Sequence, residues 1–216
     1  MDQLSIPLPR LEARGREDFM VSPSNATALR LVETWPDWPE GRLALIGPAG
    51  AGKSHLAAIW AEEAGARILP CAALSADEAP QLATAPLVLE DCDRGCDETA
   101  LFHLLNACAA AGRGLLLTGR TPPATWRVAL PDLASRLSAT TPAAIEDPDD
   151  TLLSVVLLKL FSDRQLQVKP ALIGYLLPRM ERSFAAASAL VDRLDRASLA
   201  RGVPINGALA RELLEG

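Results

Sequence analysis

The sequence predicts an α/β fold in which a five-stranded parallel sheet alternates with helices and a smaller helical subdomain follows. Three observations support this prediction. The stretch Arg42 to Leu56, RLALIGPAGAGKSHL, places a glycine-rich pattern between an apolar run and a helix-forming segment. Further apolar runs alternate with helical segments up to residue 146. Aromatic residues make up only 4% of the chain, and Ala and Leu dominate its apolar content, which favours helices around a sheet over a β-sandwich.

The glycine-rich stretch has the pattern G-x-x-x-x-G-K-[ST], with every fixed position filled. Glycines let the backbone curl so that successive amides point into a concavity for phosphates, and the following helix N-terminus adds partial positive charge. Lys53 is expected to reach the outer phosphates, and the Ser54 hydroxyl to ligate Mg²⁺. A chance glycine-rich turn is disfavoured because a strand precedes it and a helix follows. The predicted nucleotide contacts are Gly47, Pro48, Ala49, Gly50, Ala51, Gly52, Lys53, Ser54 and His55, the last with packing beside the helix as its alternative role.

Charge and composition exclude several classes of protein. The 216 residues suffice for one well-buried module with a small second subdomain. The net charge of −6 argues against a general nucleic-acid-binding surface, so no strong direct DNA binding is expected. The most apolar segment, Leu152 to Phe161, is too short to span a bilayer, so no membrane partner is expected.

Four cysteines occur in the chain, and no secretory signal precedes them, so we expect reduced thiols in a cytoplasmic protein. Cys92 and Cys96 suggest a metal site, but no second pair of ligands lies near them in the sequence. A zinc site is therefore not expected.

Residues 1–18 are expected to form a flexible tail because they show no sustained apolar period. Within this tail, alternating apolar residues and a proline favour an extended peptide that binds the groove of another protein. The alternative is that they fold back on the chain's own core. This segment is Gln3, Leu4, Ser5, Ile6, Pro7 and Leu8.

The α/β subdomain is predicted to span residues 19–146. Ser24 is a plausible N-cap for a helix that runs through Trp35. Asp97 is expected to cap a helix whose apolar residues recur at helical spacing. The predicted strands are Leu43 to Ile46, Arg67 to Pro70, Pro86 to Asp91, Leu115 to Thr118 and Ala143 to Ile145.

The third predicted strand ends in two carboxylates, Glu90 and Asp91. At the carboxyl edge of the sheet, one carboxylate can hold Mg²⁺ and a second can orient the attacking water. The alternative is an ordinary polar strand end. Thr118 ends the next strand at the same edge and is expected to touch the γ-phosphate or the water. The short helix from Leu130 to Leu137 presents Arg136.

Composition changes at an acidic break, Asp147 to Asp150, and no convincing strand candidate follows it. We therefore predict a helical lid subdomain at residues 147–216. Its expected helices are Thr151 to Ser162, Pro170 to Arg179, Ser183 to Arg201 and Ile205 to Leu214.

This arrangement resembles the AAA+ P-loop NTPases, and several strings resemble the DnaA group and its Hda-type regulators. The loop string GKSHL is similar to GK[ST]HL of that group, and EDFMVSPSNATAL is similar to its lead-in. LPDLASRL resembles the arginine-finger segment, and VDRLDRAS resembles the last lid region of Hda-type proteins. The tail string QLSIPL is similar to the QL[SD]LPL peptide that docks on the replicative sliding clamp. No segment after Leu214 resembles the DNA-binding domain of the initiator.

The resemblance implies a regulator that docks on the clamp and inserts Arg136 into the nucleotide site of the DnaA AAA+ domain, converting DnaA to its ADP form. It also implies bound ADP or ATP with Mg²⁺ at Ser54 and Glu90, and a lid arginine at Arg182 or one turn earlier at Arg179. The pair Glu90-Asp91 replaces the usual Asp-Asp, so slow intrinsic hydrolysis is expected. A homodimer remains open. The alternatives are a small-molecule kinase, which would not explain the tail, and a helicase-loader-like ATPase, which lacks an obvious clamp peptide.

Overall fold

The central feature of the computed structural model, which describes residues 16–215, is a parallel sheet. Its strand order is β2-β3-β4-β1-β5, and every neighbouring pair is parallel. The strands are β1 (Arg42–Ile46), β2 (Arg67–Pro70), β3 (Leu87–Glu90), β4 (Leu115–Gly119) and β5 (Thr141–Ala144). The predicted α/β fold with a five-stranded parallel sheet is confirmed.

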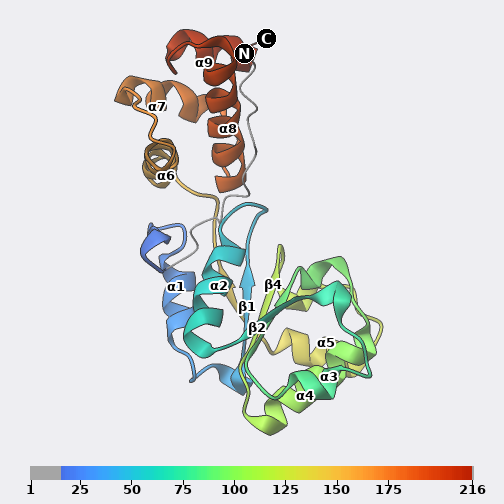
Figure 1. Ribbon diagram of the computed structural model, residues 1–216. Helices are drawn as coiled ribbons and strands as arrows, with labels where there is room; N and C mark the ends of the chain where they lie inside the picture. The colour runs from blue at the N-terminus through green and yellow to red at the C-terminus, as the bar shows by residue number, and fades with distance from the viewer. Residues whose placement is uncertain (1–15, 216) are drawn as a thin grey trace.

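Helices cover both faces of the sheet, which explains why β1 and β4 are buried at every residue. Residues of α1 and α2 pack on one face, and residues of α3, α4 and α5 pack on the other (Figure 1). These helices are α1 (Ala26–Glu33), α2 (Lys53–Ala64), α3 (Ala79–Leu82), α4 (Glu98–Ala111) and α5 (Pro131–Ser138). Short 3-10 turns connect the elements: η1 (Arg16–Asp18), η2 (Pro39–Gly41), η3 (Cys71–Ala73), η4 (Cys92–Arg94), η5 (Pro123–Thr125) and η6 (Leu177–Arg179).

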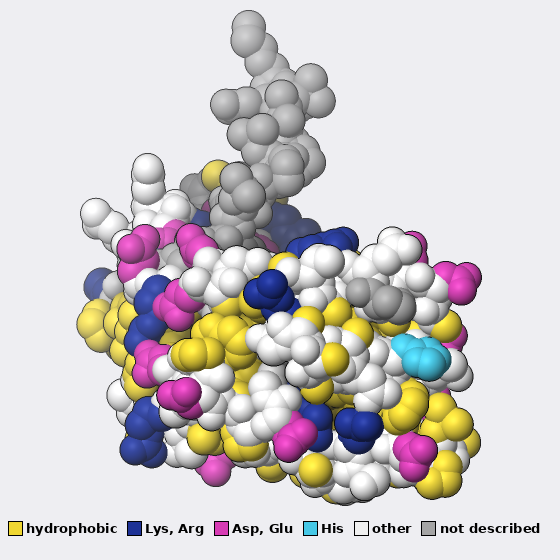
Figure 2. Space-filling view, turned by 90° about the horizontal axis from the view of Figure 1, so that it is seen from below, with side chains coloured by type: hydrophobic (Ala, Val, Ile, Leu, Met, Phe, Trp, Pro, Cys, Tyr) yellow, Lys and Arg dark blue, Asp and Glu magenta, His cyan; other side chains and the backbone are white. Residues whose placement is uncertain are grey.

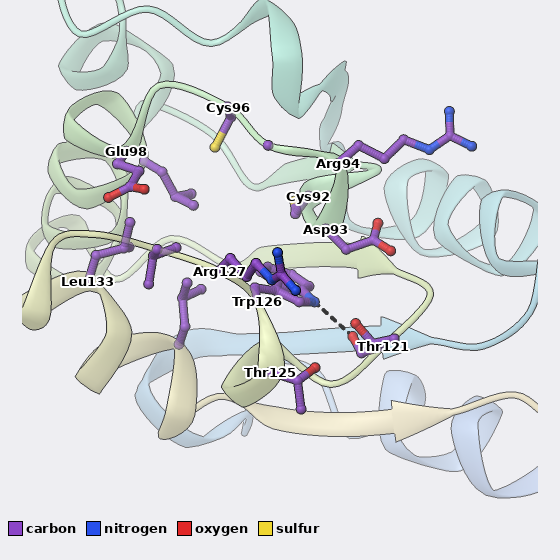
Figure 3. A pocket seen from close by; sticks show the side chains of 14 residues that line it. Cys92, Asp93, Arg94, Cys96, Glu98, Thr121, Thr125, Trp126, Arg127 and Leu133 are labelled. Carbon is purple, nitrogen blue, oxygen red and sulfur yellow. Dashed lines mark hydrogen bonds between the residues drawn. The ribbon is translucent and has the colours of Figure 1, made fainter.

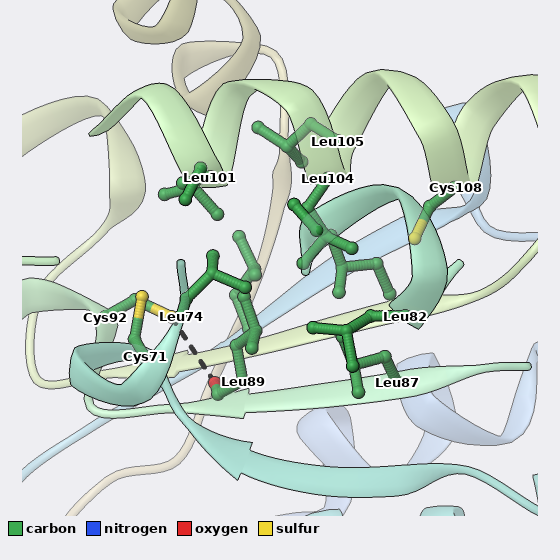
Figure 4. Close-up of a cluster of buried hydrophobic side chains, with 14 of the residues drawn as sticks. Cys71, Leu74, Leu82, Leu87, Leu89, Cys92, Leu101, Leu104, Leu105 and Cys108 are labelled. Atoms are coloured by element: carbon green, nitrogen blue, oxygen red, sulfur yellow. Dashed lines mark hydrogen bonds between the residues drawn. The ribbon is translucent and has the colours of Figure 1, made fainter. Parts of the chain in front are cut away.

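The core under α4 combines leucines of the sheet with leucines of the helix (Figure 4). The helix face has the spacing that the sequence predicts, with Leu101, Leu104, Leu105 and Cys108 all buried. Burial raises the pKa of the Cys108 thiol to about 11. A hydrogen bond with the Cys92 thiol raises the pKa of Cys71, and a hydrogen bond with Cys71 raises that of Cys96. All four cysteines are free thiols.

The two edges of the sheet are β2 and β5, which are four residues long each. A proline lies in both of them, Pro70 in β2 and Pro142 in β5. Proline has no backbone N–H. It is therefore tolerated in a sheet only at a position that donates no hydrogen bond to a neighbouring strand, as at an edge.

Four helices form the lid and enclose a hydrophobic core of their own. They are α6 (Asp150–Asp163), α7 (Pro170–Leu176), α8 (Phe184–Arg201) and α9 (Gly207–Glu215). Side chains cap three of them. Asp149 Oδ1 accepts from the Leu152 amide at 2.7 Å, and Ser183 Oγ accepts from the Ala186 amide at 3.1 Å. Asn206 Oδ1 accepts from the Ala208 amide at 2.9 Å and from the Leu209 amide at 3.1 Å. In Figure 1 the lid stands above the carboxyl edge of the sheet.

Three local predictions differ from the structure. The N-cap of α1 is Asn25 and not Ser24, since the helix begins at Ala26. The Asn25 side chain makes no capping hydrogen bond; it accepts from the Ser22 amide and donates to the Met20 carbonyl, while the Ser24 hydroxyl meets that of Ser22. Helix α1 ends at Glu33, before Trp35, which precedes a proline and is therefore biased away from helical geometry. Strand β5 begins two residues earlier than predicted, since an edge strand accepts Pro142.

Two predictions concern the amino-terminal region. The turn η1 lies inside the predicted tail of residues 1–18. The clamp-binding peptide Gln3 to Leu8 lies outside the described residues.

Candidate nucleotide site

The phosphate loop connects β1 to α2 and depends on glycine at three positions. Gly47, Gly50 and Gly52 have φ angles of 153°, 73° and 98°, which side chains rarely tolerate. A Cβ on Gly47 would lie 2.2 Å from the Ile145 carbonyl oxygen, so the loop begins in tight contact with the end of β5. These backbone angles curl the loop as the sequence pattern predicts.

Lys53 begins α2 and closes the loop. Its Nζ donates to the carbonyl oxygens of Gly47 at 2.8 Å and Pro48 at 2.7 Å. The side chain is buried, and this desolvation lowers the pKa of Lys53, while nearby Asp91 acts in the opposite direction. These two hydrogen bonds hold the Lys53 Nζ at the start of the loop.

The loop fits a nucleotide phosphate. Within residues 16–215, no hydrogen bond uses the amides of Gly50 and Gly52 in the loop or those of Lys53 and Ser54 at the start of α2. Unused amides at a helix N-terminus and a nearby lysine are the donors that a phosphate accepts from. Ser54 is exposed, so its hydroxyl is available to a metal ion. A bound nucleotide with Mg²⁺ would supply the phosphoryl group that such a site holds.

The carboxyl ends of β3 and β4 bring three predicted residues together beside the loop. The Thr118 hydroxyl is buried and accepts a hydrogen bond from the Asp91 amide at 3.1 Å. Asp91 adopts a left-handed conformation, with φ of 56°, and its side chain is exposed. Glu90 is half-buried at the end of β3. Thr118 therefore positions the Asp91 backbone, while its predicted contact with phosphate or water stays a prediction.

Charged residues that sequence reasoning missed surround this edge. Lys53 is close enough to Asp93, Arg94 and Arg120 for their charges to influence its pKa. The Asp93 Oδ2 accepts from the Arg120 amide at 2.9 Å, and Arg94 Nε lies 3.7 Å from Asp91 Oδ2. Each of these residues lies within three positions after the end of a predicted strand. Because the carboxyl ends of parallel strands meet at one edge of the sheet, this spacing could have identified them as residues near the loop.

The predicted lid arginines have partners within the lid. Arg182 Nη2 lies 2.9 Å from Asp150 Oδ1 at the start of α6. The Arg179 guanidinium lies 3.9 Å from the centre of the Tyr175 ring. These contacts do not place either arginine at the phosphate loop. The predicted contact between a lid arginine and the nucleotide phosphates therefore stays a prediction. The lid residues that lie against the loop are Ser183, Phe184 and Ala185, and none of them was predicted to contact it.

His55 is a residue of the loop helix α2 and packs against the lead-in segment. Its ring meets the ring of buried Phe19 edge to face, with centroids 5.4 Å apart. This contact joins the lead-in segment to α2, and the predicted nucleotide contact of His55 stays a prediction.

Arg136 lies at the opposite edge of the sheet from the phosphate loop. Its backbone oxygen accepts from Arg42, the first residue of β1, at 3.4 Å, and from the Thr140 hydroxyl at 3.0 Å. The loop follows the last residue of β1, about 16 Å further along the strand. The half-buried guanidinium lies 5.4 Å from the centre of the Phe102 ring on α4. Arg136 is therefore separated from the chain's own nucleotide site.

A pocket of about 490 Å³ lies between η4, the start of α4 and the segment before α5 (Figure 3). Trp126 lines it and donates from its indole N–H to the Thr121 carbonyl at 2.9 Å. The Glu98 carboxylate, at the start of α4, accepts from the amides of Ala129 and Leu130, both at 2.9 Å. The pocket does not include the phosphate loop, and its polar groups serve mainly to hold the segment that leads into α5.

The sheet order, the loop after β1 and the helical lid define an AAA+ P-loop NTPase fold. No protein-family model matches the chain. Domain III of the replication initiation protein DnaA from Thermotoga maritima is similar in structure, with a TM-score of 0.79 at 16% identity, over 96% of this chain and 98% of that one. At such identity the likeness establishes the fold, which is DnaA-like.

Other structures of this type are similar over part of their length. AMPPCP-bound DnaA from Aquifex aeolicus gives a TM-score of 0.66 at 18% identity, over 83% of this chain and 64% of that one. The RuvB Holliday junction branch migration motor of Thermotoga maritima gives 0.65 at 18% identity, over 81% and 61%. This chain therefore spans a little under two thirds of each of these longer proteins.

Two negative findings concern residues 16–215 alone. None of the helices in this part of the chain combines the length and the apolar character needed to cross a membrane. Within the same residues, no cluster of His, Cys, Asp and Glu is arranged to hold a metal ion by itself.

On the face shown in Figure 2, acidic and basic side chains are interspersed and form no extended basic patch.

Proposed function

We propose that the protein is a nucleotide-binding AAA+ regulator of replication initiation that docks on the DNA sliding clamp and stimulates ATP hydrolysis by DnaA. The DnaA-like fold over nearly the whole chain supports this proposal, together with the residue strings that resemble Hda-type regulators. ADP or ATP with Mg²⁺ would bind at the phosphate loop, with Lys53 and the amides of α2 as phosphate donors and Ser54 and Glu90 as candidate metal ligands.

The placement of Arg136 carries the proposal. A guanidinium that stabilises charge on a transferring phosphoryl group has to reach the nucleotide, and such a residue is worth about 10³ to 10⁵ in rate. Arg136 lies at the far end of β1 from the chain's own loop, bonded through its backbone to Arg42. As a finger it would therefore serve the nucleotide of another molecule, which we propose is DnaA.

Docking on the clamp would make this contact effective. The peptide Gln3 to Leu8 would hold the protein on a DNA-loaded clamp and raise its local concentration near DnaA, so that a weak contact between the two AAA+ bodies suffices. The regulator's own hydrolysis is secondary in this scheme, because the decisive reaction takes place on the nucleotide of DnaA.

The test measures ATP hydrolysis by DnaA in the presence of clamp and DNA. Arg136→Ala should abolish the stimulation while clamp binding and ADP binding stay unchanged. Arg127→Ala, which removes an exposed arginine from the segment just before α5, is the matched control and should stimulate normally. Undiminished stimulation by the Arg136 variant would refute the proposed role.

Clamp docking has a separate test. The double substitution Leu4→Ala with Leu8→Ala should abolish binding to purified clamp, while the Arg136 variant should still bind. If the double variant binds as tightly as the unchanged protein, the clamp interaction does not use this peptide.

A further inference from the structure

The lid and the α/β body have separate hydrophobic cores, so a local contact has to fix the lid over the phosphate loop. The buried members of the lid core lie between Leu153 and Ala210, and none comes from the α/β body. In Figure 1 the lower end of α8 stands directly above the loop that joins β1 to α2. The first residues of α8 make the contact.

This contact contains a hydrogen bond between two backbones. The Phe184 amide donates to the Gly50 carbonyl oxygen at 3.0 Å. Phe184 is the first residue of α8, and the amides of a first helical turn have no partner within their own helix. The Ser183 hydroxyl accepts a hydrogen bond from one of these amides, that of Ala186. The Gly50 carbonyl of the phosphate loop accepts from another, that of Phe184.

The surrounding space shows that the two segments fit closely. A Cβ on Gly50 would lie 2.9 Å from the Ser183 Cβ, and a Cβ on Gly52 would lie 3.1 Å from the Phe184 ring. The Phe184 ring also packs against the lid core, so it reaches from that core to the loop. Glycine at both loop positions is therefore required for the lid to sit where it does.

We infer that Phe184 is a positioning residue that fastens the lid to the phosphate loop and couples the lid's orientation to the loop's conformation. The hydrogen bond engages the outward carbonyl of Gly50, while the amide of the same residue is left for a phosphate. A loop held in this way is already shaped for its ligand. The coupling to ligand rests on the proposed nucleotide binding, but the contact itself does not.

Two substitutions at the same position isolate the hydrogen bond. Phe184→Ala removes the ring and keeps the amide, whereas Phe184→Pro removes both. Proline is favoured at the first position of a helix and requires an extended residue before it. Ser183 meets this requirement, with φ of −147° and ψ of 152°. The two variants therefore differ mainly in one amide donor.

Two readouts are compared in the full-length protein. Amide hydrogen exchange of residues 185–190 without nucleotide should be faster in the Pro variant than in the Ala variant, because the lid is released. The affinity for ADP should be about three- to tenfold weaker in the Pro variant, the effect of losing one backbone hydrogen bond. Gly50→Ala should release the lid as well, because its Cβ would collide with Ser183.

Equal exchange and equal ADP affinity in the Ala and Pro variants would overturn the inference. Unchanged exchange in the Gly50 variant would also count against it. If the unchanged protein itself binds no ADP, the proposed nucleotide binding fails, while the difference in exchange between the two variants still decides whether Phe184 holds the lid.

Discussion

Removing the Cys108 thiol should reduce the loss of stability at alkaline pH. The thiol has an ordinary pKa of 9.0 and a pKa of about 11 in the folded protein, where it is 2% exposed. Between these values the folded state binds more protons than the unfolded state, so the free energy of unfolding falls as the pH rises. This stabilisation is fully present below pH 9 and disappears as the pH rises through about 11. Between pH 8 and pH 10 the loss is about 1.4 kcal/mol.

Urea denaturation of the unchanged protein and of Cys108→Ala, at both pH values, measures this loss. The Ala variant should be destabilised at pH 8 by about 1 kcal/mol for the small cavity, and this difference should disappear or reverse by pH 10. Cys71 and Cys96 titrate in both proteins and cancel in the comparison. Cys108→Ser is the control, because it also removes the titrating thiol. If the difference between the proteins is the same at both pH values, burial does not shift this pKa as described.

Three further outcomes are expected. Gly47→Ala should destabilise the protein by about 3 kcal/mol or more in urea denaturation, because its Cβ would lie 2.2 Å from the Ile145 oxygen; a loss below 1 kcal/mol would show that the loop can relax. The affinity for ADP should decrease as the pH rises, and the decrease should begin below pH 10.5, the ordinary pKa of lysine. The reason is that burial lowers the pKa of Lys53 and that the neutral amine binds phosphate poorly. Constant affinity up to pH 10 in a fluorescence titration would contradict this. Asp97→Ala should cost about 1 kcal/mol, since its side chain accepts from the Ala100 amide at 3.0 Å, and an unchanged midpoint in thermal unfolding would contradict that.

The sequence predicted the elements whose signals are local. The pattern from Gly47 to Ser54 dictates its own geometry, because glycines are needed where φ is positive. The leucine spacing along α4 and the cap at Asp97 were confirmed for the same reason. The ends of elements were less predictable: the fifth strand was predicted to begin at Ala143, and the place of Pro142 at the edge of the sheet is what allows it to lie in the strand.

The rest of the site depends on distances between segments, which a single sequence does not contain. Thr118 was expected at the sheet edge, yet its hydrogen bond to the Asp91 amide depends on how β3 and β4 pair. The lid was predicted as a set of helices, but its contact with the loop uses a backbone amide of Phe184, a group that every residue except proline has. The sequence prediction concerned a different contact, between Arg182 and nucleotide phosphates; in the structure Arg182 pairs with Asp150, and the phosphate contact stays a prediction.

The prolines in the outer strands have a consequence for the protein at high concentration. An open sheet has two rows of backbone groups that can recruit strands from neighbouring molecules and start intermolecular aggregation. Here both outer strands are only four residues long and each lacks a donor, at Pro70 and at Pro142. Recruitment at β2 would otherwise be encouraged by Ile68, which is 43% exposed. Replacing either proline with a β-branched residue would lengthen an exposed ladder and favour assembly into larger species.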